Sequence, residues 1–125
     1  MKVLIVEQEK TFRESLASIV KHYHGLEVFT AHSGKEGASF FQTIPFDIVI
    51  CGHRLPDGDG LEILKEWMLC RPKLISIFMT ADHDEALRKD AEKAGIQGYL
   101  EKPFDLNQLE EAMQISDCRM WSEKK

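Results

Sequence analysis

Hydrophobic residues in this chain gather in short continuous runs that are rich in branched side chains. Such runs are typical of strands that are buried on both faces of a parallel sheet. They span residues 3–6, 28–31, 48–51, 74–79 and, more briefly, 98–100. The pattern therefore predicts five strands.

Between these runs, hydrophobic positions return every three or four residues, as on one face of a helix. Such faces carry Phe12, Leu16, Ile19, Val20 and Tyr23; then Leu61, Leu64 and Met68; and finally Leu106, Leu109 and Met113. Helix starts are indicated by a capping residue three positions before Glu or Gln, at Ser33, Asp82 and Asp105. Strands alternating with helices predict an α/β domain with one parallel sheet and right-handed crossovers.

The chain length of 125 residues suits one domain. We expect residues 1–118 to form this domain and residues 119–125 to be a tail or the start of a connector. Within the tail, Met120 and Trp121 would extend the last helix toward an output domain or make a dimer contact. No internal repeat, linker or low-complexity stretch interrupts the chain.

Charge and composition exclude several kinds of partner. The formal net charge is −5, which argues against direct binding to nucleic acid or to an anionic membrane, because such binding needs clustered Lys and Arg. No apolar run approaches the roughly 18 residues of a membrane span, and the N-terminal run is too short for a signal peptide. The three cysteines are too scattered for a disulfide framework or a zinc site. We expect a cytoplasmic protein.

Ligand sites in parallel α/β sheets lie where loops leave the carboxyl ends of the strands. The first strand is followed by Glu7, Gln8 and Glu9, and the third by the sequence Gly-His-Arg at residues 52–54. The fourth strand ends at Thr80, and the fifth leads into Lys102. These exits therefore offer acids, a hydroxyl and a cation for one site.

With these motifs in this order, the chain resembles the receiver domain of bacterial two-component response regulators, from Lys2 to about Asp117. The resemblance rests on the acidic loop after the first strand, the Pro-x-x-Asp-Gly turn that begins at Pro56, the Met-Thr-Ala segment around Thr80, and the Lys-Pro-Phe segment at residues 102–104. It implies a (βα)5 flavodoxin-like three-layer sandwich with strand order 2-1-3-4-5. It also implies a signalling module rather than an enzyme.

The chain departs from this family at the phosphoacceptor position and at the acidic pair. The resemblance implies an Asp phosphoacceptor four residues before Pro56 and five after Asp47, and that position is Gly52. The acidic pair that would help hold Mg²⁺ is altered to Glu7 and Gln8. Hard cations such as Mg²⁺ prefer carboxylate oxygens, so we expect Mg²⁺ binding to be absent or weak. Thr80 and Lys102 are left to hold a loose anion or waters.

The downstream residues of the family remain. Thr80 matches its switch hydroxyl, Tyr99 its switch aromatic residue, and Lys102 with Pro103 its pocket lysine and the following proline, across a bond that is cis in the family. We expect Lys102 to pair with Glu7. These matches favour a receiver that works through contacts with a protein partner, with an output domain or with a second copy through the last two helices and the fifth strand.

Two alternatives stay open. Phosphotransfer could use Asp57, Asp59 or His53, although the two Asp residues are typical of turns and helix caps. Strand alternation points His53 away from the direction of residue 52, so a surface or helix-packing role is expected. A small enzyme or a flavin-binding protein on the same sheet would need a Gly-rich or Ser/Thr-rich phosphate loop after the first strand, and residues 7–10 are acidic and lack glycine.

Overall fold

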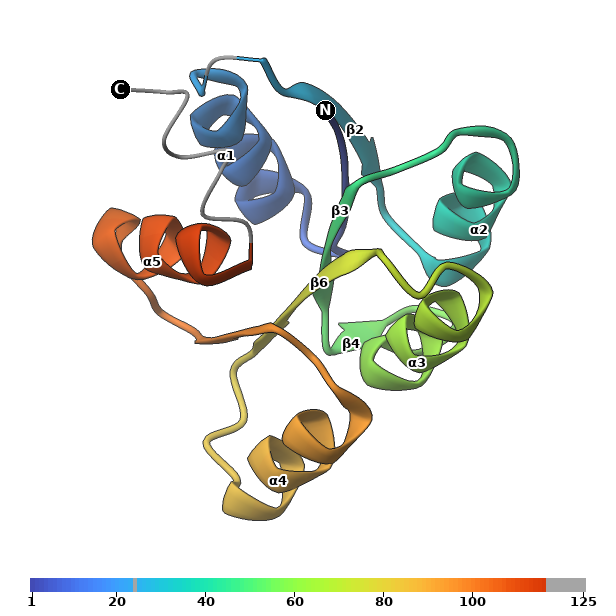
Figure 1. Ribbon diagram of the computed structural model, residues 1–125. Coiled ribbons are helices and arrows are strands. Elements are labelled where there is room, and N and C mark those ends of the chain that lie inside the picture. Colours follow the sequence, from blue (N-terminus) through green and yellow to red (C-terminus); the bar gives the residue numbers. More distant parts are fainter. Residues whose placement is uncertain (24, 117–125) are drawn as a thin grey trace.

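The computed structural model describes residues 1–23 and 25–116 of the chain. Five parallel strands form one sheet in the order β2-β1-β3-β6-β7 (Figure 1). Their bounds are Lys2–Val6 for β1, Glu27–Ala31 for β2, Ile48–Gly52 for β3, Ile75–Thr80 for β6 and Gly98–Glu101 for β7. This order is the predicted 2-1-3-4-5, so the α/β fold class is confirmed.

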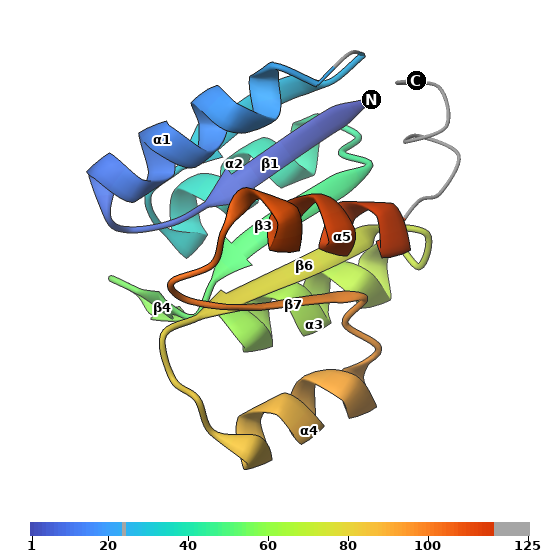
Figure 2. The ribbon, with the colours of Figure 1, turned by 90° about the vertical axis from the view of Figure 1, so that its left-hand side faces the viewer.

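The helices cover both faces of the sheet, which gives three layers. Helices α1 (Lys10–Lys21) and α5 (Leu106–Ser116) lie on one face (Figure 2). Helices α2 (Gly34–Thr43), α3 (Gly60–Cys70) and α4 (Glu85–Ala94) lie on the other. The predicted sandwich is therefore observed, and no helix of the described residues is long and apolar enough to cross a membrane.

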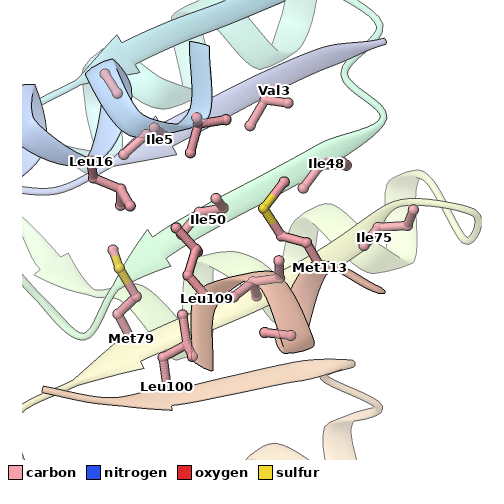
Figure 3. Packing of buried hydrophobic residues seen from close by; sticks show 14 of the residues in the cluster. Val3, Ile5, Leu16, Ile48, Ile50, Ile75, Met79, Leu100, Leu109 and Met113 are labelled. Atoms are coloured by element: carbon pink, nitrogen blue, oxygen red, sulfur yellow. The ribbon is translucent and has the colours of Figure 1, made fainter. Parts of the chain in front are cut away.

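Alternating side chains explain why the strands read as continuous hydrophobic runs. Val3 and Ile5 of β1 pack toward α1 and α5, whereas Leu4 and Val6 pack toward α2 and α3. All four are fully buried, because a strand covered on both faces has no solvent side. Figure 3 shows the first of these clusters, where Leu109 and Met113 of α5 meet the sheet.

Two of the three predicted helix caps are in place. The Ser33 hydroxyl accepts the Glu36 N–H. The Asp105 carboxylate accepts the Gln108 N–H, and the Gln108 side-chain oxygen accepts the Asp105 N–H. The prediction of Asp82 as a cap was wrong, since α4 begins after Asp84, whose carboxylate accepts the Ala86 N–H. Asp82 instead lies in the loop after β6, where it binds Arg54.

The structure corrects two expected core positions. Ile19 is 38% exposed and Leu106 is 50% exposed, because both lie at the rim of a groove between α1 and α5 rather than beneath the helices. The turn after β3 also contains a short antiparallel pair, β4 (Arg54–Leu55) and β5 (Gly58–Asp59), which the hydrophobic pattern did not indicate. The expected tail with Met120 and Trp121 lies outside the described residues.

Candidate functional site

The carboxyl ends of β1, β3, β6 and β7 meet at one edge of the sheet, where a cleft of about 200 Å³ opens. Its lining includes Glu7, Gln8, His53, Arg54, Thr80 and Lys102. Parallel strands bring these loops together because all four strands end at the same edge. The fold therefore gathers the predicted pocket residues Glu7, Gln8, Thr80 and Lys102.

Glu7 is held inside this cleft by two hydrogen bonds. Its side chain is 4% exposed, and its Oε1 accepts the Lys102 ammonium at 2.8 Å. Its Oε2 accepts the Glu9 N–H at 2.9 Å. The expected pairing of Glu7 with Lys102 is thus observed, and a buried carboxylate is compensated on both oxygens, as its desolvation requires.

The Glu7 carboxylate fills the space next to Gly52. A Cβ added at Gly52 would lie 2.6 Å from Glu7 Oε1, well inside van der Waals contact. Glutamate is one methylene longer than aspartate, and this length brings its carboxylate over the end of β3. A side chain at residue 52 and the present position of Glu7 are therefore mutually exclusive.

The Lys102 ammonium, one of two cations in the lining of the cleft, is bound to other groups of the protein. The Lys102 ammonium lies 4.3 Å from the centre of the Phe12 ring in addition to its bond with Glu7. The peptide bond between Lys102 and Pro103 is cis. Lys102 is paired with Glu7, and Arg54, the other cation that lines the cleft, is paired with Asp82. Little positive charge is therefore left for the loose anion that the sequence suggested.

The residues present do not fit a Mg²⁺ ion. Both oxygens of Glu7 already accept hydrogen bonds, Gln8 is an exposed amide, and Gly52 has no side chain. The described part of the chain contains no cluster of three His, Cys, Asp or Glu side chains arranged to hold a metal. Mg²⁺ is usually bound through one or two carboxylates together with waters. Glu9, the other carboxylate that lines the cleft, already accepts the N–H groups of Thr11 and Phe12 at the start of α1, so neither Glu7 nor Glu9 is free to bind the ion.

Thr80 is bound to a residue that sequence reasoning placed elsewhere. The His53 Nδ1 lies 2.9 Å from the Thr80 Oγ1, and the His53 side chain is only 14% exposed. The prediction of His53 as a surface or helix-packing residue was wrong. Strand β3 ends at Gly52, so the alternation of a strand no longer controls the direction of residue 53.

Tyr99 lies outside the cleft, on the face of the sheet that α4 covers. Its ring contacts Phe78, with 5.8 Å between ring centres, and the Arg88 guanidinium lies 4.7 Å from its centre. Its hydroxyl is buried and has no hydrogen-bond partner among residues 1–23 and 25–116. Burial, followed by the negative charge of Glu101, raises the pKa of Tyr99.

Both acids of the turn after β3 serve as helix caps. The Asp57 carboxylate accepts the N–H groups of Gly34 and Lys35 at 2.9 and 2.8 Å, and so caps α2 from outside its own segment. Asp59 caps α3 by accepting the Leu61 N–H at 2.8 Å. Helix N-termini favour such negative charges, which confirms the expectation of cap chemistry.

The substitution Asp57→Asn is expected to destabilise the protein at neutral pH and to matter less as the pH falls. The bonds from Gly34 and Lys35 hold the pKa of the Asp57 carboxyl below its usual range. A lowered pKa contributes stability above the pKa of the unfolded chain, and that contribution disappears as the pH falls through the folded value. Urea unfolding of both proteins at pH 7 and at about pH 3 checks this. An equal difference at the two pH values would contradict it.

Comparison with known proteins assigns the chain to a family of signalling domains. Residues 3–114 match the response regulator receiver domain. The transcriptional regulatory protein CrdR of Helicobacter pylori is 33% identical over 113 residues, which cover 87% of this chain and 51% of CrdR. The KDP operon transcriptional regulatory protein KdpE of Escherichia coli is 32% identical over 117 residues, covering 91% and 50%. The chain thus spans about half the length of these curated relatives.

Solved structures give the same result for the fold. A response regulator receiver domain protein from Clostridium thermocellum superposes with a TM-score of 0.84 at 28% identity, covering 98% of both chains. A CheY-like receiver domain protein from Methanospirillum hungatei superposes with a TM-score of 0.86 at 24% identity, covering 98% of this chain and 97% of its own. The similarity therefore extends over the whole described domain.

Proposed function

Because the chain belongs to the response regulator receiver domain family, a family of signalling modules rather than enzymes, we propose that it is a receiver without a phosphoacceptor. Gly52 stands at the acceptor position, and the protein acts through phosphorylation-independent contacts with other proteins. Thr80, Tyr99, Lys102 and Pro103 are the residues of the switch and pocket that it retains.

The contact between Glu7 and Gly52 is the observation that carries this proposal. The lack of a nucleophile at residue 52 could by itself be a local loss. Here, however, the Glu7 carboxylate occupies the space that a side chain at residue 52 would need, and Lys102 and the Glu9 N–H hold it there. The pocket is therefore internally satisfied. Gln8 removes a second charge that would recruit Mg²⁺.

The use of another phosphoacceptor finds less support. Both carboxylate oxygens of Asp57 and one of Asp59 accept N–H groups in helix caps, so phosphorylation would remove bonds that hold α2 and α3. The nitrogen of His53 nearer to Thr80 is hydrogen-bonded, and its other nitrogen lies 3.8 Å from Asp59. The negative charge of Asp59 would repel an incoming phosphoryl group.

Intact-mass measurement after incubation with acetyl phosphate and Mg²⁺ tests the proposal. The wild-type protein is expected to keep its mass, because no carboxylate is free at residue 52. A gain of about 80 Da, one phosphoryl group, would contradict this. Repeating such a result with Asp57→Asn, Asp59→Asn and His53→Gln would then identify which residue accepts the group.

The surface formed by α4, β7 and α5 is the one that we propose for a partner. Arg88 of α4 covers the Tyr99 ring and lies 3.5 Å from Glu101 of β7, so the three residues form a polar and aromatic patch in the lining of a cleft of about 190 Å³. A second copy or an output domain would bind there. Sedimentation velocity on the wild type and on Arg88→Glu distinguishes these: a monomer in both would argue against the homodimer.

A further inference from the structure

The contact between His53 and Thr80 connects the end of β3 to the end of β6, one residue beyond Gly52. We propose that a proton taken up by the His53 ring replaces phosphorylation as the input to Thr80. This assigns a regulator to the site described above, and it rests on the proposed function. His53 is then a positioning residue that acts through the Thr80 hydroxyl.

The hydrogen bonds of Thr80 make this contact sensitive to a proton. The Thr80 Oγ1 already accepts the Asp82 N–H at 2.9 Å, and a hydroxyl has one proton to donate. It can donate that proton to the Nδ1 of a neutral His53 ring. When the ring is protonated, both ring nitrogens are donors, so the bond must reverse and the Thr80 proton must turn elsewhere.

Three charged side chains surround the His53 ring. Asp82 Oδ2 lies 3.5 Å from Nδ1, and Asp59 Oδ2 lies 3.8 Å from Nε2. Arg54 of β4 opposes them, since its guanidinium binds the same Asp82 oxygen at 2.6 Å. Two carboxylates against one guanidinium leave a net negative environment at the ring, and imidazole is the side chain that gains a proton within the physiological pH range.

The other charged groups near the cleft do not alter this balance. Glu7 and Lys102 neutralise each other at 2.8 Å, and the Glu9 carboxylate, which also lines the cleft, accepts two N–H groups at the start of α1. His83, in the loop before α4, places its Nε2 3.1 Å from the Lys102 carbonyl oxygen, and it is exposed. His83 is therefore the one nearby histidine among the described residues whose titration must be separated from that of His53.

A continuous set of contacts leads from His53 to the surface proposed for a partner. The His53 ring packs edge-on against Phe78, with 5.4 Å between ring centres, and Phe78 contacts Tyr99 at 5.8 Å. Tyr99 in turn lies under Arg88. Thr80 lies two positions after Phe78 on the same face of β6, and the register pairs Phe78 with Tyr99 and Thr80 with Glu101. Thr80 is therefore a diagonal neighbour of Tyr99 in the sheet, and a change in the His53 ring can reach Tyr99 through Phe78 and through Thr80.

Nuclear magnetic resonance across about pH 5 to 8 tests the proposal on the whole chain. In the wild type, the ring signals of His53 and the backbone amide of Tyr99 are expected to shift with one common midpoint. In His53→Gln the shift of the Tyr99 amide should be lost, and in the matched control His83→Gln it should remain. Thr80→Val should keep the His53 titration and reduce the Tyr99 shift at least twofold.

Several results would overturn the proposal. These are a Tyr99 amide that ignores pH, a Tyr99 shift that persists in His53→Gln, or one that is lost only in His83→Gln. If His53→Gln does not fold, the Thr80→Val protein decides, because an undiminished Tyr99 shift there breaks the connection. Phosphorylation of the wild type in the mass assay would contradict the proposed function alone, whereas an unphosphorylated chain with a pH-insensitive Tyr99 would contradict the His53 proposal alone.

Discussion

The triple variant Glu7→Asp, Gln8→Asp, Gly52→Asp is expected to gain about 80 Da from acetyl phosphate and Mg²⁺, whereas Gly52→Asp alone is not. Aspartate at residue 52 supplies the nucleophile, and aspartate at residue 8 restores an oxygen ligand for the metal. Shortening Glu7 by one methylene removes the carboxylate that would lie 2.6 Å from the new Cβ. It also frees Lys102 to bind the phosphoryl oxygens.

The double variant Gln8→Asp, Gly52→Asp is the control that isolates Glu7. These two changes supply the acceptor and one acid, but they leave the long carboxylate in place and bound to Lys102. We expect the triple variant to be phosphorylated roughly tenfold or more faster, since charge placed at the reacting group contributes strongly to phosphoryl transfer.

Intact mass against time is the measurement, with a sample lacking Mg²⁺ as the blank. Equal rates for the double and triple variants would show that Glu7 does not block the site. A folded triple variant that stays unphosphorylated would show that Gly52 is not the acceptor position.

Loss of the Lys102 ammonium is expected to cost the protein more stability than loss of any exposed ion pair. Lys102→Met leaves Glu7, 4% exposed, as a buried charge without its partner. Breaking a buried pair from one side costs about 3 kcal/mol. Glu7→Gln should cost only about 1 kcal/mol, because Lys102 is 24% exposed and can reach water. The combined Glu7→Gln, Lys102→Met protein should recover part of the loss.

Urea unfolding followed by circular dichroism measures these differences, and Lys2→Met is the matched control. Lys2 pairs with Glu27 at 2.6 Å, but the two side chains are 37% and 61% exposed. Exposed pairs contribute about 0.5 kcal/mol or less. Similar losses for Lys2→Met and Lys102→Met would mean that the cleft does not desolvate Glu7 enough to matter.

The strands could be predicted from local patterns because burial on both faces leaves a continuous hydrophobic run, whereas their order was implied by the resemblance to receiver domains. Residues 48–51 illustrate this, as β3 ends one residue later at Gly52. The hydrophobic and capping patterns were less reliable at the ends of helices and at the edges of the core. Asp82 stands three residues before Glu85, the spacing of a capping residue, and Asp84 lies within the same segment. Only the path of the loop after β6 decides that Asp84 caps α4.

Some residues of the candidate site could likewise be found from the sequence, and others could not. The resemblance to receiver domains, counted from Asp47 and Pro56, predicts that Gly52 stands at the acceptor position, and Glu7 and Gln8 can be read without coordinates. The bond of His53 to Thr80 was missed, because the two residues are 27 positions apart and a strand rule was applied one residue past the end of the strand. The available signal was a polar ring directly after a buried strand.

The sequence by itself thus determined the parallel α/β fold and the absence of an acid at residue 52, because both follow from residue types at short spacings. Only the tertiary structure decided which side chain lies beside Gly52. Glu7 reaches over Gly52 because Lys102, 95 positions away, holds its carboxylate there. That arrangement depends on distances between distant segments, and packing of the whole sheet sets those distances.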